Sequence, residues 1–216
     1  VGTKAPGAAG TRTTSWPAAD ELLGRGGLGR SAPTLVNNDA PGHTGYRKLI
    51  AQTFRVSRVR QMEPYVTETV TALVEAIRGK AEVDVASAIA LPLPTYVIAD
   101  QLGVARDDLE KFKRWTEALL YLFRPPKTED ELLEDARQLA QMHQYMIRRM
   151  AERRAQPQDD IISDLVNDTL PGGEKLTDRE AMSMIEQLLV GGIEATASGI
   201  ASGLVRLATG QTLQAE

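Results

Sequence analysis

Apolar residues recur at the three- to four-residue spacing of an α-helix along most of the chain, and few segments alternate as strands do. The pattern therefore predicts a mainly α protein. Helices are expected over 39–54, 57–78, 91–102, 107–123, 129–154 and 161–167, with a short one near 18–23 that the Gly-rich run 24–29 ends. The side chains expected to cap two of these helices are Asn38 or Asp39 and the pair Asp159-Asp160.

The last helix, expected over 178–209, differs from the others because almost all of its positions are apolar or small. Thr177 and Glu180 have the spacing of a capping box at its start. Between its first and last turns the only charged residues are Glu186 and Glu194. A transmembrane span is the competing interpretation, but two carboxylates and four glycines disfavour it. We therefore expect a long central helix that is buried on nearly all sides.

The chain is expected to form one helical domain over residues 16–216, preceded by a flexible lead-in over residues 1–15. The lead-in is rich in Gly, Ala and Thr, and it has the apolar core of neither a signal peptide nor a membrane anchor. No repeat of the length found in solenoids or propellers is visible.

Charge and cysteine content exclude several classes of function. The net charge of −4 over 216 residues indicates no general attraction to nucleic acid or to an anionic membrane. Arginines cluster over 55–60 and 148–154, which we interpret as solvated helix faces, and His143 is likewise expected to face solvent. The chain contains no cysteine, which excludes disulfides, cysteine-bound zinc, iron–sulfur clusters and thiol nucleophiles within these residues.

Two pairs of residues could bind a ligand. His43 and Arg47 are four residues apart at the start of a helix, so they share a face and could hold one or two carboxylates or phosphates. An ordinary exposed pair is the alternative interpretation. Gly191 and Gly192 lie in mid-helix, where each costs roughly 1 kcal/mol relative to alanine. Close approach of a flat ligand or of another backbone is therefore expected there.

A carboxylate and a hydroxyl follow the two glycines. Glu194 is expected to be buried beside Thr196, and an unpaired buried carboxylate is costly. Either these residues have a function, or an arginine from elsewhere satisfies Glu194 while the glycines allow tight helix packing. For Gly199 and Gly203, which share a face, we expect close packing.

Read in order, four segments resemble the cytochrome P450 family, specifically its soluble bacterial members. They are Asn38–Arg47 (family pattern D-x-P-x-H-T-x-x-R), Leu91–Val104 (a buried helix with a Leu-Gly-Val end), Asp159–Leu165 (D-D-L-L-S-x-L) and Leu188–Thr196 (A/G-G-x-D/E-T-T). The match covers roughly residues 33–209, in the family's order and spacing.

The resemblance implies a cytochrome P450-like helical fold built around a long central helix. It further implies a haem-dependent monooxygenase that oxidises an apolar organic molecule with O2, using electrons from NAD(P)H through a ferredoxin-type partner. The implied cofactor is haem b, and the implied location is the cytoplasm.

The resemblance also implies roles for individual residues. His43 and Arg47 would bind the haem propionates, and Gly191 and Gly192 would let the central helix lie against the distal haem face. Glu194 would be the acid of the proton-delivery pair. The substrate pocket would be lined by Leu119, Leu120, Phe123 and Leu188.

Two departures from the family pattern matter. Ala195 occupies the position of the family's distal threonine, and Thr196 points about 100° away, so it cannot simply substitute. Proton delivery would then rely on water or on a substrate hydroxyl. The family's axial cysteine and its E-x-x-R helix follow the central helix, so this chain is expected to be a part of the enzyme without a metal ligand.

Two alternatives to the enzyme remain open from the sequence. One is a haem-free helical binding or interaction fragment that keeps the pocket walls but not the catalysis. The other is a ligand-responsive regulator, which is disfavoured because no helix-turn-helix with a basic recognition face is found.

Overall fold

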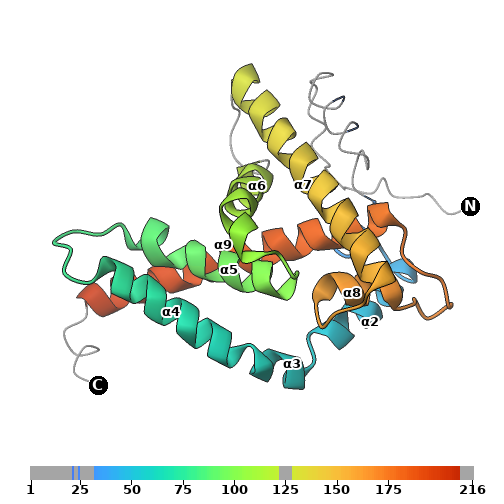
Figure 1. The fold of residues 1–216 in the computed structure, drawn as a ribbon, viewed down its shortest axis with the longest axis horizontal. Helices are drawn as coiled ribbons and strands as arrows, with labels where there is room; N and C mark the ends of the chain where they lie inside the picture. Colours follow the sequence, from blue (N-terminus) through green and yellow to red (C-terminus); the bar gives the residue numbers. More distant parts are fainter. Residues whose placement is uncertain (1–20, 22–23, 25–31, 122–127, 210–216) are drawn as a thin grey trace, which may run out of the picture.

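The computed structural model describes residues 21, 24, 32–121 and 128–209, which fold as helices joined by short loops (Figure 1). The prediction of a mainly α protein is confirmed. The helices are α2 (Gly42–Thr53), α3 (Val56–Gln61), α4 (Glu63–Ile77), α5 (Pro92–Gln101), α6 (Leu109–Tyr121), α7 (Glu129–Ala155), α8 (Ile161–Asn167) and α9 (Asp178–Thr209), with a π-helical turn over Ala86–Ala90 and a 3₁₀ turn over Arg106–Asp108. The expected lead-in, the glycine-rich run and most of the short helix near 18–23 lie outside the described residues.

The predicted helix boundaries agree with the observed ones to within a few residues, except at one division. The helix expected over 57–78 is two helices, α3 and α4, which meet at Met62. Pro64 lies in the first turn of α4, where a missing N–H leaves no hydrogen bond unmade. In a continuous helix its ring would clash with the carbonyl of Arg60, so the chain restarts instead.

Side-chain caps form at the start of α8 and α9 but not of α2. Glu180 accepts a hydrogen bond from the Thr177 amide at 2.8 Å, and the predicted capping box is confirmed. Asp160 accepts one from the Ser163 amide at 2.8 Å, as a cap of α8 should. The expected side-chain cap of α2 is wrong, because no side chain caps its first turn and backbone hydrogen bonds take over that role.

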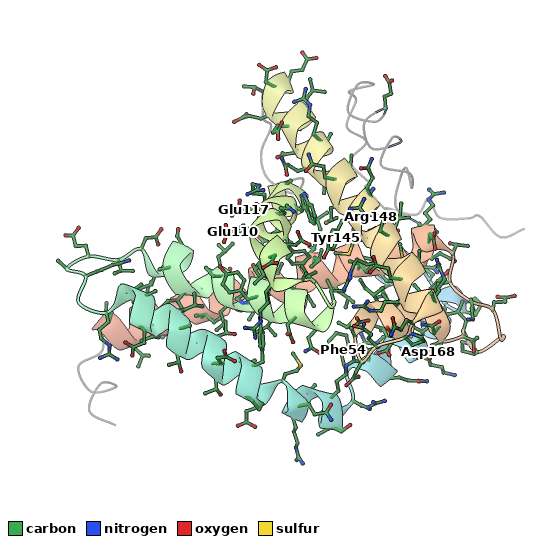
Figure 2. The ribbon with its side chains drawn as sticks, in the orientation of Figure 1. Phe54, Glu110, Glu117, Tyr145, Arg148 and Asp168 are labelled. Carbon is green, nitrogen blue, oxygen red and sulfur yellow. The ribbon has the colours of Figure 1, made fainter. Side chains whose placement is uncertain are left out.

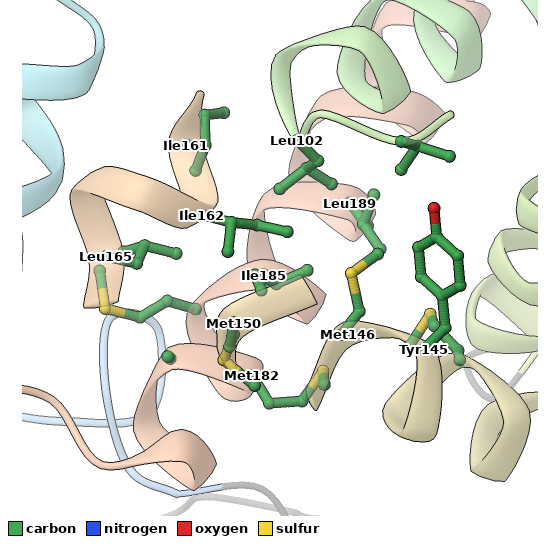
Figure 3. Packing of buried hydrophobic residues seen from close by; sticks show 14 of the residues in the cluster. Leu102, Tyr145, Met146, Met150, Ile161, Ile162, Leu165, Met182, Ile185 and Leu189 are labelled. Carbon is green, nitrogen blue, oxygen red and sulfur yellow. The ribbon is translucent and has the colours of Figure 1, made fainter. Parts of the chain in front are cut away.

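The hydrophobic core lies where α9 contacts α5, α6, α7 and α8. Figure 3 shows methionines of α7 and α9 packed between the isoleucines of α8 and the end of α5. Long, unbranched methionine side chains suit the irregular space between helices that cross at different angles. The core residues labelled there are Leu102, Tyr145, Met146, Met150, Ile161, Ile162, Leu165, Met182, Ile185 and Leu189.

Aromatic contacts join α6 to α7. The rings of Trp115 and Tyr145 are 5.2 Å apart at an angle of 50°. The guanidinium of Arg148 lies 6.0 Å from the Tyr145 ring centre (Figure 2), within the range of a cation–π contact.

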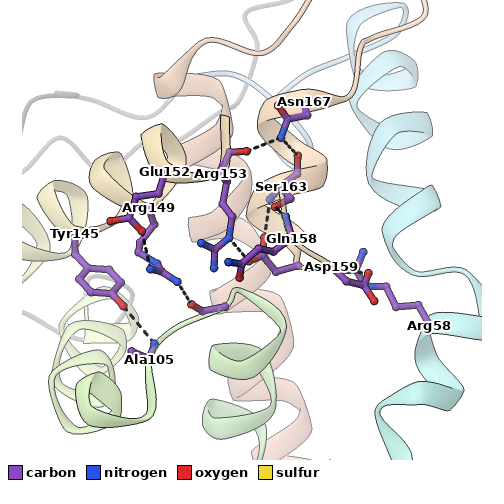
Figure 4. Close-up of polar contacts among 12 residues, drawn as sticks. Arg58, Ala105, Tyr145, Arg149, Glu152, Arg153, Gln158, Asp159, Ser163 and Asn167 are labelled. Atoms are coloured by element: carbon purple, nitrogen blue, oxygen red, sulfur yellow. Dashed lines mark hydrogen bonds and ion pairs between the residues drawn. The ribbon is translucent and has the colours of Figure 1, made fainter. Parts of the chain in front are cut away.

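A polar network joins the end of α5 to α7 and α8 (Figure 4). Arg153 and Asp160 form an ion pair whose side chains are each 5% exposed. Gly103 lies against this pair with φ of 66°, and a Cβ there would lie 2.8 Å from Arg153 Nη2. Arg149 donates a hydrogen bond to the Gly103 carbonyl at 2.6 Å. The Leu-Gly-Val corner therefore requires glycine for both its backbone conformation and its contacts.

A second buried arginine, Arg58, ties α3 to α8. Its guanidinium pairs with Asp164, which also accepts a hydrogen bond from Thr53 Oγ1 at 3.0 Å. A further contact, at 3.6 Å, reaches Asp159. The interpretation of both arginine clusters as solvated faces is thus wrong for Arg58 and Arg153, because carboxylates compensate these two cations within the fold.

The burial of α9 changes halfway along its length. Residues 181–185 and Leu189 are buried, but beyond Gly191 only Ile193 and Ala197 are buried among the described residues. The expectation of burial on nearly all sides is wrong for this second half, because the described residues pack against only one side of it. By length and composition alone α9 could cross a membrane, a test that the core helix of a soluble protein also passes.

Candidate functional site

His43 and Arg47 share one face of α2, as their spacing predicts. Arg47 is exposed and His43 is partly exposed, and neither forms an ion pair with another described residue. Their face lies about a quarter turn round from the inward-facing stripe of the helix. That stripe consists of Tyr46, Leu49, Ile50 and Thr53. The two hydrogen-bond donors, His43 and Arg47, are therefore available to a ligand with one or two acidic groups.

The first turns of α9 hold the segment that leads into α2. The Ala32 amide donates a hydrogen bond to Ser183 Oγ at 2.6 Å, and the Val36 amide donates one to Gln187 Oε1 at 2.8 Å. Gln187 lies four residues before Gly191, which is about 6 Å along the helix axis. The segment that leads into α2 is thus held by a part of α9 that lies about one turn before Gly191.

Tyr46 anchors α2 itself to α9. Its hydroxyl donates a hydrogen bond to Glu180 at 2.6 Å. Burial and the Glu180 carboxylate raise the pKa of Tyr46 to about 12. Burial opposes the ionisation of Glu180, but hydrogen bonds from Tyr46 and Thr177 outweigh it and lower the pKa of this carboxyl. At neutral pH a protonated phenol therefore meets a charged carboxylate, which is a strong hydrogen-bonding combination.

Gly191, Gly192 and Ala195 form a flat, exposed strip along α9. At about 100° per residue the three positions fall within one sector of the helix. A Cβ placed on either glycine would meet no heavy atom within 4 Å. The strip carries no side chain larger than a methyl group, so a planar molecule could lie directly against the helix backbone.

Glu194 and Thr196 flank this strip on either side and are both exposed. The expectation that Glu194 is buried is wrong, because the covered side of α9 is the opposite one, marked by Ile193 and Ala197. An exposed carboxylate needs no arginine partner. Close packing at Gly199 and Gly203 is also wrong for the described part of the chain, since a Cβ at either position would meet nothing within 4 Å.

The residues expected to line a substrate pocket have different surroundings. Leu119 and Leu120 are 5% and 7% exposed and belong to the core cluster. Leu188 is partly buried and packs against that cluster. Phe123 lies outside the described residues. The lining of a pocket by these four residues stays a prediction.

A buried polar pair that sequence reasoning missed joins α7 to α9. His143 is 4% exposed, and its Nε2 lies 2.7 Å from Glu186 Oε1. The prediction of a solvent-facing histidine is wrong because the charges near it in sequence lie on other faces of α7. Its register with the inward-facing Leu139, Met142, Met146 and Met150 could have revealed its burial.

The described residues contain no group of three or more His, Cys, Asp or Glu side chains that could hold a metal ion. The sequence as a whole has no cysteine.

Comparisons with known proteins agree with the resemblance found in the motifs. The cytochrome P450 family model matches residues 28–216. Cytochrome P450 monooxygenase PikC of Streptomyces venezuelae is 34% identical over 175 residues, which are 80% of this chain and 40% of that protein. Cytochrome P450(BM-1) of Priestia megaterium is 33% identical over 168 residues, 78% of this chain and 41% of that protein. The chain thus spans about 40% of the length of these curated relatives.

Solved structures show the same arrangement of helices. The crystal structure of P450BioI in complex with an acyl carrier protein ligated to hexadec-9Z-enoic acid superposes with a TM-score of 0.74 and 27% sequence identity. The superposition covers 94% of this chain and 50% of that one.

Proposed function

Because the chain belongs to the cytochrome P450 family, we propose that it forms the propionate-binding and distal part of a haem-dependent monooxygenase. The enzyme inserts one oxygen atom of O2 into an apolar organic molecule. Its electrons come from NAD(P)H through a ferredoxin-type partner, and its cofactor is haem b. It works in the cytoplasm, with neither nucleic acid nor membrane as a partner.

The open strip on α9 is the observation that carries this proposal. A flat prosthetic group needs a wall without protruding side chains, and Gly191, Gly192 and Ala195 offer one in the middle of an apolar helix. The helix with His43 and Arg47 is anchored to the same α9, one to three turns earlier. A single long helix thus positions both the glycine strip and the His43–Arg47 pair.

The residues present fit the edge and one face of a haem. His43 and Arg47 would hold its propionates by charge-assisted hydrogen bonds, and the glycine strip would lie against the distal face. Bound haem would supply the one-electron and O2 chemistry that amino-acid side chains lack. The thiolate ligand of the iron would come from outside these 216 residues, since they contain no cysteine.

Proton handling falls to the residues beside the strip. Glu194 is exposed and can exchange protons with solvent. Ala195 has no hydroxyl to pass a proton on, and the Thr196 hydroxyl is about 100° round the helix from it. Glu194 would therefore deliver protons through water, or through a hydroxyl of the substrate held over Ala195.

The apolar substrate would be held by Leu119, Leu120, Phe123 and Leu188. Leu119 and Leu120 lie on α6, which contacts α9, and Leu188 is one turn before the strip. Apolar walls of this kind favour a substrate that binds by its apolar surface.

An absorption spectrum of the intact, reduced protein under carbon monoxide tests the proposed function. We expect the strongly red-shifted Soret band of a thiolate-ligated haem. A protein with no Soret band, even after haemin is added, would instead be a haem-free helical binding or interaction protein.

A further inference from the structure

We propose that Tyr46 is a positioning residue, whose hydrogen bond to Glu180 fixes the rotation of α2 and so the direction in which His43 and Arg47 point. The inference rests on the proposed function, because it concerns how His43 and Arg47 are directed at the haem propionates. Tyr46 itself is not expected to touch the haem.

The geometry of α2 supports this role. The helix is pinned by a polar contact near each end, and both contacts start from its inward-facing stripe. Near the first turn Tyr46 bonds to Glu180 of α9 at 2.6 Å, and at the last residue Thr53 bonds to Asp164 of α8 at 3.0 Å. No side chain caps the first turn. The Tyr46 contact is therefore the polar anchor of that end within the described residues.

The positions of the pair follow from the direction of Tyr46. Arg47 is the next residue, about 100° round the helix, and His43 lies three residues earlier on the same side. Side-chain tips stand about 6 Å from the helix axis, so a rotation of about 20° moves them by about 2 Å. A shift of that size exceeds what a hydrogen bond to a propionate tolerates.

Glu180 is a rigid anchor point. Its carboxylate accepts hydrogen bonds from the Thr177 amide at 2.8 Å and from Thr177 Oγ1 at 2.7 Å, which hold it in one orientation. It also lies in the first turn of α9, where the helix dipole favours a negative charge. Tyr46 therefore bonds to a group that is already ordered.

The test compares Tyr46→Phe with Tyr65→Phe in the intact protein. Tyr65 is a matched control because its hydroxyl also donates a hydrogen bond, to the Tyr96 carbonyl at 3.3 Å, but between α4 and α5. Haemin affinity of the apoprotein and amide hydrogen exchange over residues 42–53 are measured for both variants.

We expect Tyr46→Phe to bind haemin roughly five- to tenfold more weakly and to exchange its α2 amides faster, as loss of one hydrogen bond to a charged group allows. The Tyr65→Phe control should leave both readouts unchanged, even if it lowers the thermal midpoint equally. In a Glu180→Gln background, Tyr46→Phe should reduce haemin affinity by a smaller factor, because the charged acceptor is gone.

Two results overturn the inference. One is faster exchange in α2 with unchanged haemin affinity, which leaves the proposed function standing. The other is an equal loss of affinity in both tyrosine variants, which assigns the effect to general stability. If the wild-type protein takes up no haem, the proposed function fails, and the positioning role fails with it.

Discussion

The two halves of α9 have nearly the same apolar composition but opposite surroundings. In the first half, residues 181–185 are buried, and polar contacts reach α2, α7 and the segment over 32–36. In the second half only Ile193 and Ala197 are buried among the described residues, and the glycines face open space. Helix α4, which packs against α5 and the π-helical turn over Ala86–Ala90, likewise contributes no buried residue.

The difference separates two demands that an apolar helix can meet. The first half stabilises this chain through packing and ion pairs, so substitutions there should change the free energy of unfolding. The second half offers a smooth surface, so substitutions there should change ligand binding more than stability. Paired substitutions, one at a packed position and one at an exposed position, separate these two roles.

Removal of Asp160 should be the most damaging change. Asp160→Ala leaves the buried Arg153 guanidinium without its partner and removes the cap of α8, and we expect a loss of about 3–5 kcal/mol in unfolding free energy. Glu134→Gln, in an exposed pair with Arg137, should cost a few tenths of a kcal/mol at most. Urea denaturation of both variants provides the comparison, and similar losses would mean that the buried pair is not a main stabilising contact.

Replacing glycine by alanine should lower the free energy of unfolding at a packed position and raise it at an open one. Gly103→Ala forces a side chain into a left-handed conformation against Arg153, and should cost about 2 kcal/mol or more. Gly191→Ala meets nothing within 4 Å and should stabilise the haem-free protein by about 1 kcal/mol. Thermal and urea unfolding measure both. A destabilised Gly191→Ala apoprotein would show that the strip is packed after all.

The two histidines of the chain should have different roles, His143 in stability and His43 in haemin binding. His143→Ala removes a buried hydrogen bond to the Glu186 carboxylate and should cost about 1–3 kcal/mol in unfolding free energy. His43→Ala should leave the unfolding free energy unchanged and weaken haemin binding. Parallel denaturation and haemin titration distinguish the roles. Exchanged effects would place the ligand beside α7 rather than α2.

The Tyr46–Glu180 hydrogen bond should make the smallest contribution to the free energy of unfolding, about 1 kcal/mol. It should make this contribution only within a limited pH range. Folding lowers the pKa of Glu180 from 4.5, so its share is present above that pH and is lost as the pH falls through the lower folded value. Folding raises the pKa of Tyr46 from 10.0 to about 12, so its share is present below pH 10 and is lost as the pH rises towards 12. The midpoint difference between wild type and Tyr46→Phe, followed against pH, should therefore form a plateau. A pH-independent difference would speak against the charged hydrogen bond.

Local signals in the sequence predicted much of the fold. The apolar period located α5 to α9, and the Thr177–Glu180 spacing located the start of α9, because these features depend on residues only a few positions apart. The order of the four motifs alone indicates the family. Gly103 follows the end of α5, where a left-handed glycine is expected, so its conformation is also predictable from the sequence.

Contacts between distant segments could not be predicted in the same way. Arg153–Asp160 and His143–Glu186 depend on how helices meet, so Arg153 and His143 were expected to face solvent. The exposure of Glu194 was missed for a related reason. Periodicity shows which faces of a helix are apolar, but it does not show whether this chain or another molecule covers them.

The haemin affinity of variants along the glycine face of α9 tests most directly whether the open strip is a haem wall. Leucine in place of Gly191 or Gly192 should preserve the helix, since leucine favours it more than glycine does, yet weaken haemin binding about tenfold or more by holding the ring away. Gly203→Leu, three turns further along the same exposed face, should bind haemin like the wild type. Equal affinities in all three variants would show that the haem does not lie against Gly191 and Gly192.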